Sequence, residues 1–217
     1  MALALFDLDK TLLDGDSDFE WGQFLVKKKL VDEEEYAKAN QYFYEEYQRG
    51  TLDIVEFSAF SFKPLSKLGR SNLNELHAEF MQSVIIPMIR NQSQATIDKH
   101  HTQGDISIMI TATNSFITQP IADHFGIQHL IATEPKIVDG NYTTEIEGTP
   151  CFQEGKVTRL HEWMKQHDAD LQGSYLYSDS MNDLPLLEAV ENAIAVQPDE
   201  ILKTTAEARG WPIITLD

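Results

Sequence analysis

Short apolar runs alternate with helical patterns over much of the chain, and this alternation constrains the fold more than any other feature. A first run covers residues 2–8, and strand-like runs recur at 106–110, 129–132, 174–177, 193–196 and 212–215. Between the later runs lie helical patterns at 116–125, 155–168, 183–190 and 199–209. Near-continuous apolar strands alternating with helices are typical of sheets covered on both faces. The sequence therefore predicts an α/β fold with a doubly wound, mostly parallel sheet.

Residues 15–90 interrupt this alternation, because they contain helical patterns and no strand-like run. Helices are predicted at 18–29, 32–48, 52–62 and 71–84, with breaks at Gly50, Pro64, Gly69 and Pro87. A chain of 217 residues has room for one core domain and a sizeable insertion. We predict an α/β core formed by 1–14 and 91–217, and an inserted helical cap domain at 15–90.

The predicted cap holds twelve of the chain's 21 aromatic residues. Most of them are expected to form the core of the cap, and a few are candidates for lining a substrate cavity beneath it. A second, smaller insertion is predicted at 134–147, where the Asp139-Gly140 pair is typical of a tight β-hairpin turn.

Charge and cysteine content limit the partners of the chain. There are 17 Lys and Arg residues against 35 Asp and Glu residues, which gives a net charge of −18. Nucleic acid and anionic membrane surfaces are disfavoured, because both require a basic surface. The apolar start contains Asp7 and Asp9, so neither a signal peptide nor a membrane span is expected. Cys151 is the only cysteine, so no internal disulfide can form and a cytoplasmic protein is favoured. A monomer or a homodimer is expected.

Carboxylates cluster at the predicted ends of two strands. Asp7 and Asp9 end the first apolar run, and Asp179 and Asp183 follow the run at 174–177. Like charges at a buried sheet edge are costly unless a cation lies between them. Asp183 has an alternative role as an acid at a helix start, whereas Asp179 lies at the strand end itself. Oxygen ligands from two strand ends suit Mg²⁺, completed by water and a phosphate group.

Two further residues are candidates for binding the phosphate group itself. Thr111 is predicted at the end of the run at 106–110, just before a helix, where a hydroxyl and free amides form an anion site. Lys156 lies at a predicted helix start, an unfavourable place for a cation unless it has another role. A solvated lysine is the simpler explanation for Lys156 taken alone.

The order of these motifs resembles the haloacid dehalogenase superfamily, and the two insertions resemble its phosphoserine-phosphatase-like branch, subfamily IB. The motifs are DxDxT at residues 7–11, Thr111, Lys156 and DxxxD at residues 179–183. The resemblance implies a phosphatase in which Asp7 is the nucleophile and Asp9 is the general acid and base.

The same resemblance implies the ligands of the metal and of the substrate. Mg²⁺ would be bound by Asp7, the Asp9 carbonyl and Asp179, with Asp183 supporting the metal or its waters. Thr111 and Lys156 would hold phosphate oxygens. The remaining predicted substrate-binding residues are Asp16, Ala112 and Asn182.

Residues soon after the first motif bear on the leaving group of the substrate. In the resembled branch an acidic residue there binds an ammonium group, and the matching position is Asp16. An N-cap for the next helix is an equally good explanation of Asp16. The branch's carboxylate-binding Arg has no counterpart, since its position falls near Ala59 and no Arg lies between Arg49 and Arg70. Phosphoserine is therefore disfavoured, and L-histidinol phosphate, an amine without a carboxylate, is the hypothesis for the substrate.

Three alternatives stay open at this point. One is phosphoserine phosphatase, and another is a phosphotransferase with the same chemistry, in which an alcohol replaces water. The third is a non-catalytic, Mg²⁺-dependent phospho-acceptor domain, against which the acid Asp9 and the large cap both argue.

Overall fold

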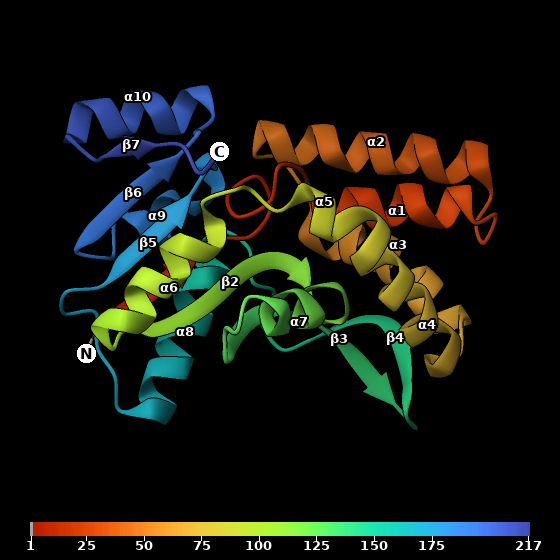
Figure 1. Cartoon of the computed structure of the whole chain (residues 1–217). Coiled ribbons are helices and arrows are strands. Elements are labelled where there is room, and N and C mark those ends of the chain that lie inside the picture. Colours follow the sequence, from red (N-terminus) through yellow and green to blue (C-terminus); the bar gives the residue numbers. More distant parts are fainter. Residues whose placement is uncertain (1) are drawn as a thin grey trace.

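The computed structural model describes residues 2–217 and contains a seven-stranded sheet with helices on both faces (Figure 1). The strands are β1 (Leu3–Phe6), β2 (Ile106–Asn114), β3 (His129–Val138), β4 (Asn141–Glu147), β5 (Tyr175–Ser178), β6 (Asn192–Val196) and β7 (Ile213–Ile214). Their order in the sheet is β4-β3-β2-β1-β5-β6-β7, and only the β3–β4 pair is antiparallel. The predicted mostly parallel α/β fold is therefore confirmed.

Helices fill the connections. They are α1 (Ser17–Lys27), α2 (Glu33–Arg49), α3 (Ile54–Lys67), α4 (Arg70–Phe80), a π-helical turn (Met81–Ile85), α5 (Ile86–Met88), α6 (Ser93–Gln103), α7 (Ser115–His124), α8 (Glu154–His167), a 3₁₀ turn (Met181–Asp183), α9 (Leu184–Leu187) and α10 (Glu200–Arg209). None of the helices formed by residues 2–217 has both the length and the hydrophobicity that crossing a bilayer requires.

The central strand β1 determines where a ligand can bind. Its side chains alternate between the two faces, so that Leu3 and Leu5 join one buried cluster and Ala4 and Phe6 join the other. From β1 the chain builds β2 and β3 on one side and then returns to add β5 on the other. Such a reversal opens a crevice beyond the carboxyl ends of the strands, where α/β proteins bind ligands.

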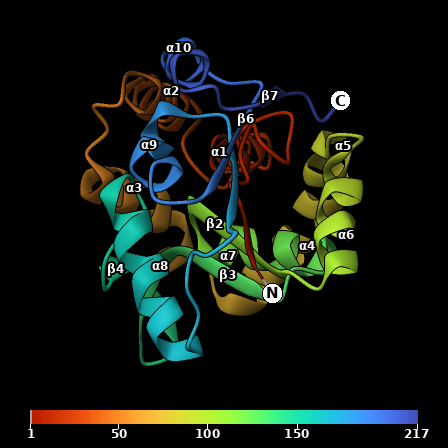
Figure 2. The same ribbon diagram turned by 90° about the vertical axis from the view of Figure 1, so that its left-hand side faces the viewer.

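Helices α1 to α4 lie on the right-hand side of Figure 1, where α4 is level with the β3–β4 hairpin and α1 to α3 lie above it. Figure 2 shows the same arrangement turned by 90°. Trp21 of α1 packs against Phe80 of α4 and Phe116 of α7, with ring centroids 5.1 and 5.5 Å apart. One continuous buried cluster thus joins α1, α3 and α4 to the sheet, and the domain boundaries stay a prediction.

The hairpin at 134–147 follows the prediction. Asp139 and Gly140 both have positive φ, 49° and 79°, as a two-residue turn of the primed type requires. Residues 129–133 of the same β3 strand belong to the parallel sheet, and its outer part pairs with β4 against α3. One strand therefore connects the core sheet to the inserted helices.

Helix ends at proline were predicted wrongly. Helix α3 continues to Lys67 through the buried Pro64, and the helical path from Arg70 reaches Met88 through Pro87. The π-helical turn ends two residues before Pro87 and contains Ser83, whose carbonyl the missing proline N–H leaves without its usual helical donor. Helix α6 was missed because its sequence is mostly polar, and only a few side chains such as Ile97 are buried.

Candidate active site

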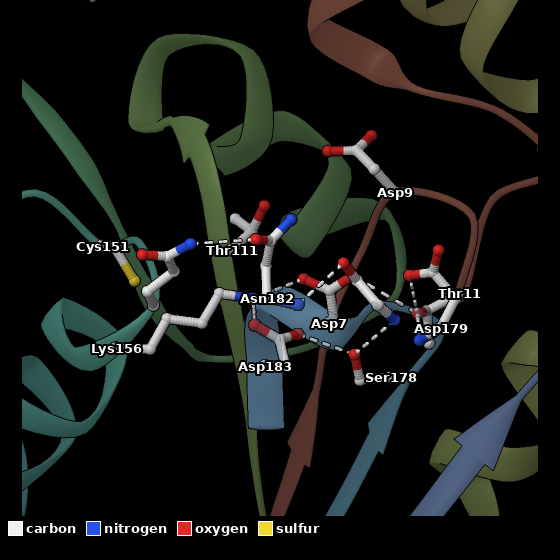
Figure 3. Close-up of polar contacts among 12 residues, drawn as sticks. Asp7, Asp9, Thr11, Thr111, Cys151, Lys156, Ser178, Asp179, Asn182 and Asp183 are labelled. Carbon is white, nitrogen blue, oxygen red and sulfur yellow. Dashed lines mark hydrogen bonds and ion pairs between the residues drawn. The ribbon is translucent and has the colours of Figure 1, made fainter. Parts of the chain in front are cut away.

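Asp7 lies at the carboxyl end of the central strand, with its side chain directed into a buried polar cluster (Figure 3). Its backbone N–H donates to the Tyr177 carbonyl at 2.9 Å, which continues the pairing of β1 with β5 by one residue. The residue is only 4% exposed. Burial raises the pKa of Asp7 to about 7, although the charge of Lys156 opposes that shift. Asp7 is therefore a carboxylate that needs cations to stay ionised.

Lys156 provides one such cation. Its Nζ lies 2.8 Å from Asp7 Oδ1 and 2.6 Å from Asp183 Oδ1, and the side chain is 2% exposed. Burial alone would lower the pKa of Lys156, but the carboxylates of Asp183 and Asp7 raise it above its ordinary value. The solvated lysine considered from the sequence is excluded by this geometry.

Gly155 allows Lys156 to reach that position. A Cβ atom on Gly155 would lie 2.1 Å from the Pro150 carbonyl oxygen, closer than any side chain tolerates. The loop before α8 therefore packs directly on the first turn of the helix, because residue 155 has no side chain. Lys156, the third residue of α8, then extends its side chain toward Asp7 and Asp183 (Figure 3).

Thr11 connects the first acidic motif to the second. Its hydroxyl lies 3.3 Å from Asp7 Oδ2 and 3.1 Å from Asp179 Oδ1, and it accepts from the Asp179 N–H at 3.0 Å. Burial and then the charge of Asp7 raise the pKa of Asp179 well above its ordinary value. Asp7 and Asp179 are thus two carboxylates held near each other. The role of Thr11 was not predicted, although it is the last residue of the DxDxT motif.

Asp183 lies on the other side of Asp7. Both of its oxygens are engaged, because Oδ1 contacts Lys156 and Oδ2 accepts from the Ser178 hydroxyl at 2.7 Å. Asp183 is thus held by Lys156 and Ser178, and it orients the Lys156 ammonium beside Asp7. Its role beside the metal stays a prediction.

The Asp9 side chain turns away from the other carboxylates (Figure 3). Its Oδ1 accepts from the Ser17 N–H, and its Oδ2 accepts from the Thr113 hydroxyl at 2.8 Å. Burial, followed by the charge of Asp16, raises the pKa of Asp9 to about 6. The carboxyl group therefore lines the pocket as a group able to hold a proton near neutral pH.

The oxygen donors suit a magnesium ion. Within residues 2–217 no three side chains of His, Cys, Asp and Glu are arranged to hold a metal by themselves. Two carboxylates, Asp7 and Asp179, approach each other, and burial leaves them short of positive charge. Magnesium sites commonly use one or two carboxylates and complete the shell with water and phosphate oxygens. The donor set present at this sheet edge therefore fits Mg²⁺.

A pocket opens above Asp7, between the sheet edge and helices α1 to α3. Thr111, Ala112 and Thr113 form its wall on the sheet side. Thr111 lies within β2, which runs to Asn114 with a register shift after Ile110, rather than at the predicted strand end. The opposite wall is mostly aromatic and acidic, and consists of Asp16, Asp18, Phe19, Asn40, Phe43, Tyr44, Tyr47, Leu52, Ile54 and Phe57.

Asp16 and Asn182, two predicted substrate-binding residues, lie near the site and also make hydrogen bonds that stabilise the fold. Asp16 is the N-cap of α1, since its Oδ1 accepts from the Phe19 N–H at 2.9 Å, and it also lines the pocket. The Asn182 side chain donates to the Tyr47 carbonyl at 3.1 Å and accepts from the Gln153 side chain at 3.1 Å. Asn182 therefore joins the end of α2 to the sheet edge. No sequence motif predicted this contact.

The family follows from a comparison with known proteins. The model of the haloacid dehalogenase-like hydrolase family matches residues 4–188. The chain belongs to this family. The predicted superfamily and enzyme class, a phosphoric monoester hydrolase, are thereby confirmed.

Individual relatives of this haloacid dehalogenase-like hydrolase agree with the assignment. A histidinol-phosphatase of Neisseria meningitidis serogroup C (strain 8013) is 44% identical over 216 residues, which cover 98% of this chain and 97% of the relative. A crystal structure of a protein of unknown function from Bordetella pertussis Tohama I is 45% identical, with a TM-score of 0.94, and the match covers 100% and 99% of the two chains. A substrate-bound phosphoserine phosphatase complex has the same fold, with 17% identity, a TM-score of 0.73 and coverage of 100% and 93%.

Proposed function

We propose that the chain is a Mg²⁺-dependent phosphatase that hydrolyses a small cationic phosphomonoester, L-histidinol phosphate, through an aspartyl-phosphate intermediate. The observation that carries the substrate assignment is the pocket wall, which offers carboxylates and aromatic rings to the leaving group and contains neither Arg nor Lys. A protonated amine and an imidazole match such a wall. The histidinol-phosphatase activity of the relative from Neisseria meningitidis points the same way.

Asp7 is the proposed nucleophile. An oxygen of its carboxylate forms a bond to phosphorus as the bond from phosphorus to the leaving oxygen breaks, and Asp9 gives its proton to that oxygen. Asp9, now ionised, then takes a proton from a water molecule that attacks the phosphorus, which releases phosphate and restores Asp7. Each transfer needs in-line positioning and charge neutralisation more than covalent help from the protein.

Lys156 and Thr111 support the phosphate group in this proposal. The Lys156 ammonium, held between Asp7 and Asp183, neutralises charge where a carboxylate meets a phosphate dianion. Thr111 lines the pocket beside Asp7, with Ala112 next to it. Asp7, the Asp9 carbonyl and Asp179 would hold Mg²⁺, and Asp183 would support its waters. The metal supplies charge neutralisation for the phosphate oxygens.

Phosphoserine is a poorer match for the same pocket. Its carboxylate would face Asp16 and Asp18, without a guanidinium group in the wall to pair it. An unpaired carboxylate in a closed site costs several kcal/mol, on the order of 2–5. The similarity to phosphoserine phosphatase structures shows a shared fold, and it does not identify the substrate of this chain.

A panel of phosphomonoesters assayed with Mg²⁺ tests the proposal. We expect L-histidinol phosphate to give the highest kcat/KM, with phosphoserine well below it, and faster turnover of phosphoserine would overturn the substrate. Acid quenching followed by intact-mass measurement should detect phosphorylated wild type, and Asp7→Asn should lack the added mass. Phosphate transfer to an added alcohol in preference to water would instead indicate a phosphotransferase, and phosphorylation without turnover an acceptor domain.

The metal requirement has its own test. Chelation should abolish phosphate release, and Mg²⁺ should restore it and raise the melting temperature. Asp179→Asn should lose most of that stabilisation, whereas Asp123→Asn, which removes an exposed carboxylate on α7, should keep it. Equal stabilisation of both variants by Mg²⁺ would place the metal elsewhere.

A further inference from the structure

Asp18 is a buried carboxylate that the phosphate chemistry does not use. It lies in the first turn of α1, is 8% exposed and lines the pocket. Its Oδ1 accepts from the Ser61 hydroxyl of α3 at 2.9 Å, and the Asn114 side chain is a second polar neighbour that favours its ionised form. Across residues 2–217 no Lys, Arg or His side chain lies within ion-pair distance of it. A buried charge without a counter-ion is costly unless something that enters the site supplies one.

The surroundings of Asp18 increase this cost. Two charged groups raise its pKa further, the carboxylates of Asp16 and Asp9, which have the same sign. Burial first, and then Asp16, raise the pKa of Asp18 to about 7. Asp16 has more support, because the charge of Lys10 and the Phe19 N–H both favour its ionised form. The two acids of this wall are therefore unequal, and Asp18 has the greater need for a cation.

Asn40 provides a second acceptor in the same wall. Its side-chain nitrogen donates to the Phe19 carbonyl at 3.0 Å, which fixes the orientation of the amide. The side-chain oxygen of this residue, which is 5% exposed and lines the pocket, accepts no hydrogen bond from residues 2–217. The Asp18 carboxylate, which has donors but no counter-ion, and the free Asn40 oxygen line one pocket from adjacent helices, and together they suit an N–H-bearing cation.

We propose that Asp18, together with the side-chain oxygen of Asn40, binds the positively charged nitrogen of the leaving group, and that Asp16 serves this wall as the N-cap of α1. This inference rests on the proposed function and names the residue that selects its substrate. It differs from what the family resemblance implies, in which Asp16 binds the ammonium group, and it keeps the alternative role of Asp16 as an N-cap.

The test compares Asp18→Asn and Asp16→Asn in the complete chain with Mg²⁺. The measurement is the ratio of kcat/KM for L-histidinol phosphate to that for p-nitrophenyl phosphate, which has no positive charge. We expect Asp18→Asn to lower this ratio by roughly thirty-fold or more through KM, as loss of a buried charge partner does. Ser61→Ala keeps the carboxylate and should lower it far less, and Asp123→Asn controls for the change in net charge.

An unchanged ratio in Asp18→Asn, or a selective loss in Asp16→Asn alone, would overturn the inference and leave the proposed function standing. If the wild type fails to hydrolyse any cationic phosphomonoester, the proposed function and the inference both fail. Asp18→Asn is nearly isosteric and removes an unpaired buried charge, so we expect it to fold, and its melting temperature verifies that.

Discussion

The ammonium nitrogen of Lys156 lies 2.8 Å from the carboxylate of Asp7, and neither side chain is more than 5% exposed. The same nitrogen contacts Asp183, so one cation stabilises two buried carboxylates. Without Mg²⁺, Lys156→Met should lower the free energy of unfolding by about 3–5 kcal/mol, because two buried charges lose their partner. Urea denaturation measures this loss.

A second substitution provides the control for that measurement. Adding Asp183→Asn to Lys156→Met removes one of the unpaired charges, so part of the lost stability should return. A Lys156→Met protein as stable as the wild type would show that the pair contributes nothing. Phosphate release should be lost in both variants, since neither has the ammonium group beside Asp7.

Asp9 should matter most for leaving groups that need a proton. Its raised pKa, about 6, keeps part of the population protonated near neutral pH. Asp9→Asn should reduce kcat for an alkyl phosphate by roughly 10²- to 10⁴-fold, the range of general acid catalysis. The reduction should be smaller for p-nitrophenyl phosphate, whose leaving group is stable as an anion. Equal losses for the two substrates would argue against proton donation by Asp9.

Gly155→Ala tests how closely the start of α8 must pack. The added methyl would meet the Pro150 carbonyl oxygen and shift the helix start, and Lys156 with it. A displacement of about 1 Å can cost on the order of a hundred-fold in rate, so we expect a loss of that size in kcat/KM. Gly69→Ala is the matched control, since nothing lies within 4 Å of its added methyl. Similar activities of the two variants would contradict the expectation.

Asn182→Ala should loosen the junction between α2 and the sheet edge. It removes the bonds to the Tyr47 carbonyl and to Gln153, each of which contributes about 1 kcal/mol. KM should rise several-fold, and hydrogen exchange should accelerate at residues 47–52. Gln153→Ala should have a similar effect, and the double variant should add little because the two side chains form one network. Additive effects would mean that the two contacts act separately.

Asp18 should make stability depend on pH. Its pKa is about 7 in the folded protein, against an ordinary value of 3.8, so the folded state binds its proton more tightly than the unfolded state does. Stability contributed by the protonated group is fully present below pH 3.8 and is lost as the pH rises toward 7. Asp18→Asn should remove up to about 4 kcal/mol of that loss. Denaturation at several pH values measures it, and Asp123→Asn should follow the wild type.

The sheet, the hairpin and the order of the site residues could be predicted from the sequence, because strands and their ends have recognisable local patterns. The contacts of Lys156 could not be predicted from a pattern, since its partners Asp7 and Asp183 lie far from it in the chain or on another element. The pocket wall was even less accessible to prediction. It is assembled from α1, α2 and α3, whose aromatic residues look alike in sequence whether they fill a core or face a cavity.

The shared packing of Trp21, Phe80 and Phe116 has a consequence for how a substrate enters. Lifting α1 and α4 away would expose these rings, at a cost on the order of 4 kcal/mol each. The far end of α2 is held by a few polar bonds and a small cluster around Phe43. We therefore expect the inserted helices to pivot about these aromatic contacts and to open at residues 47–52. Substrate and product would then enter and leave along that one edge of the pocket.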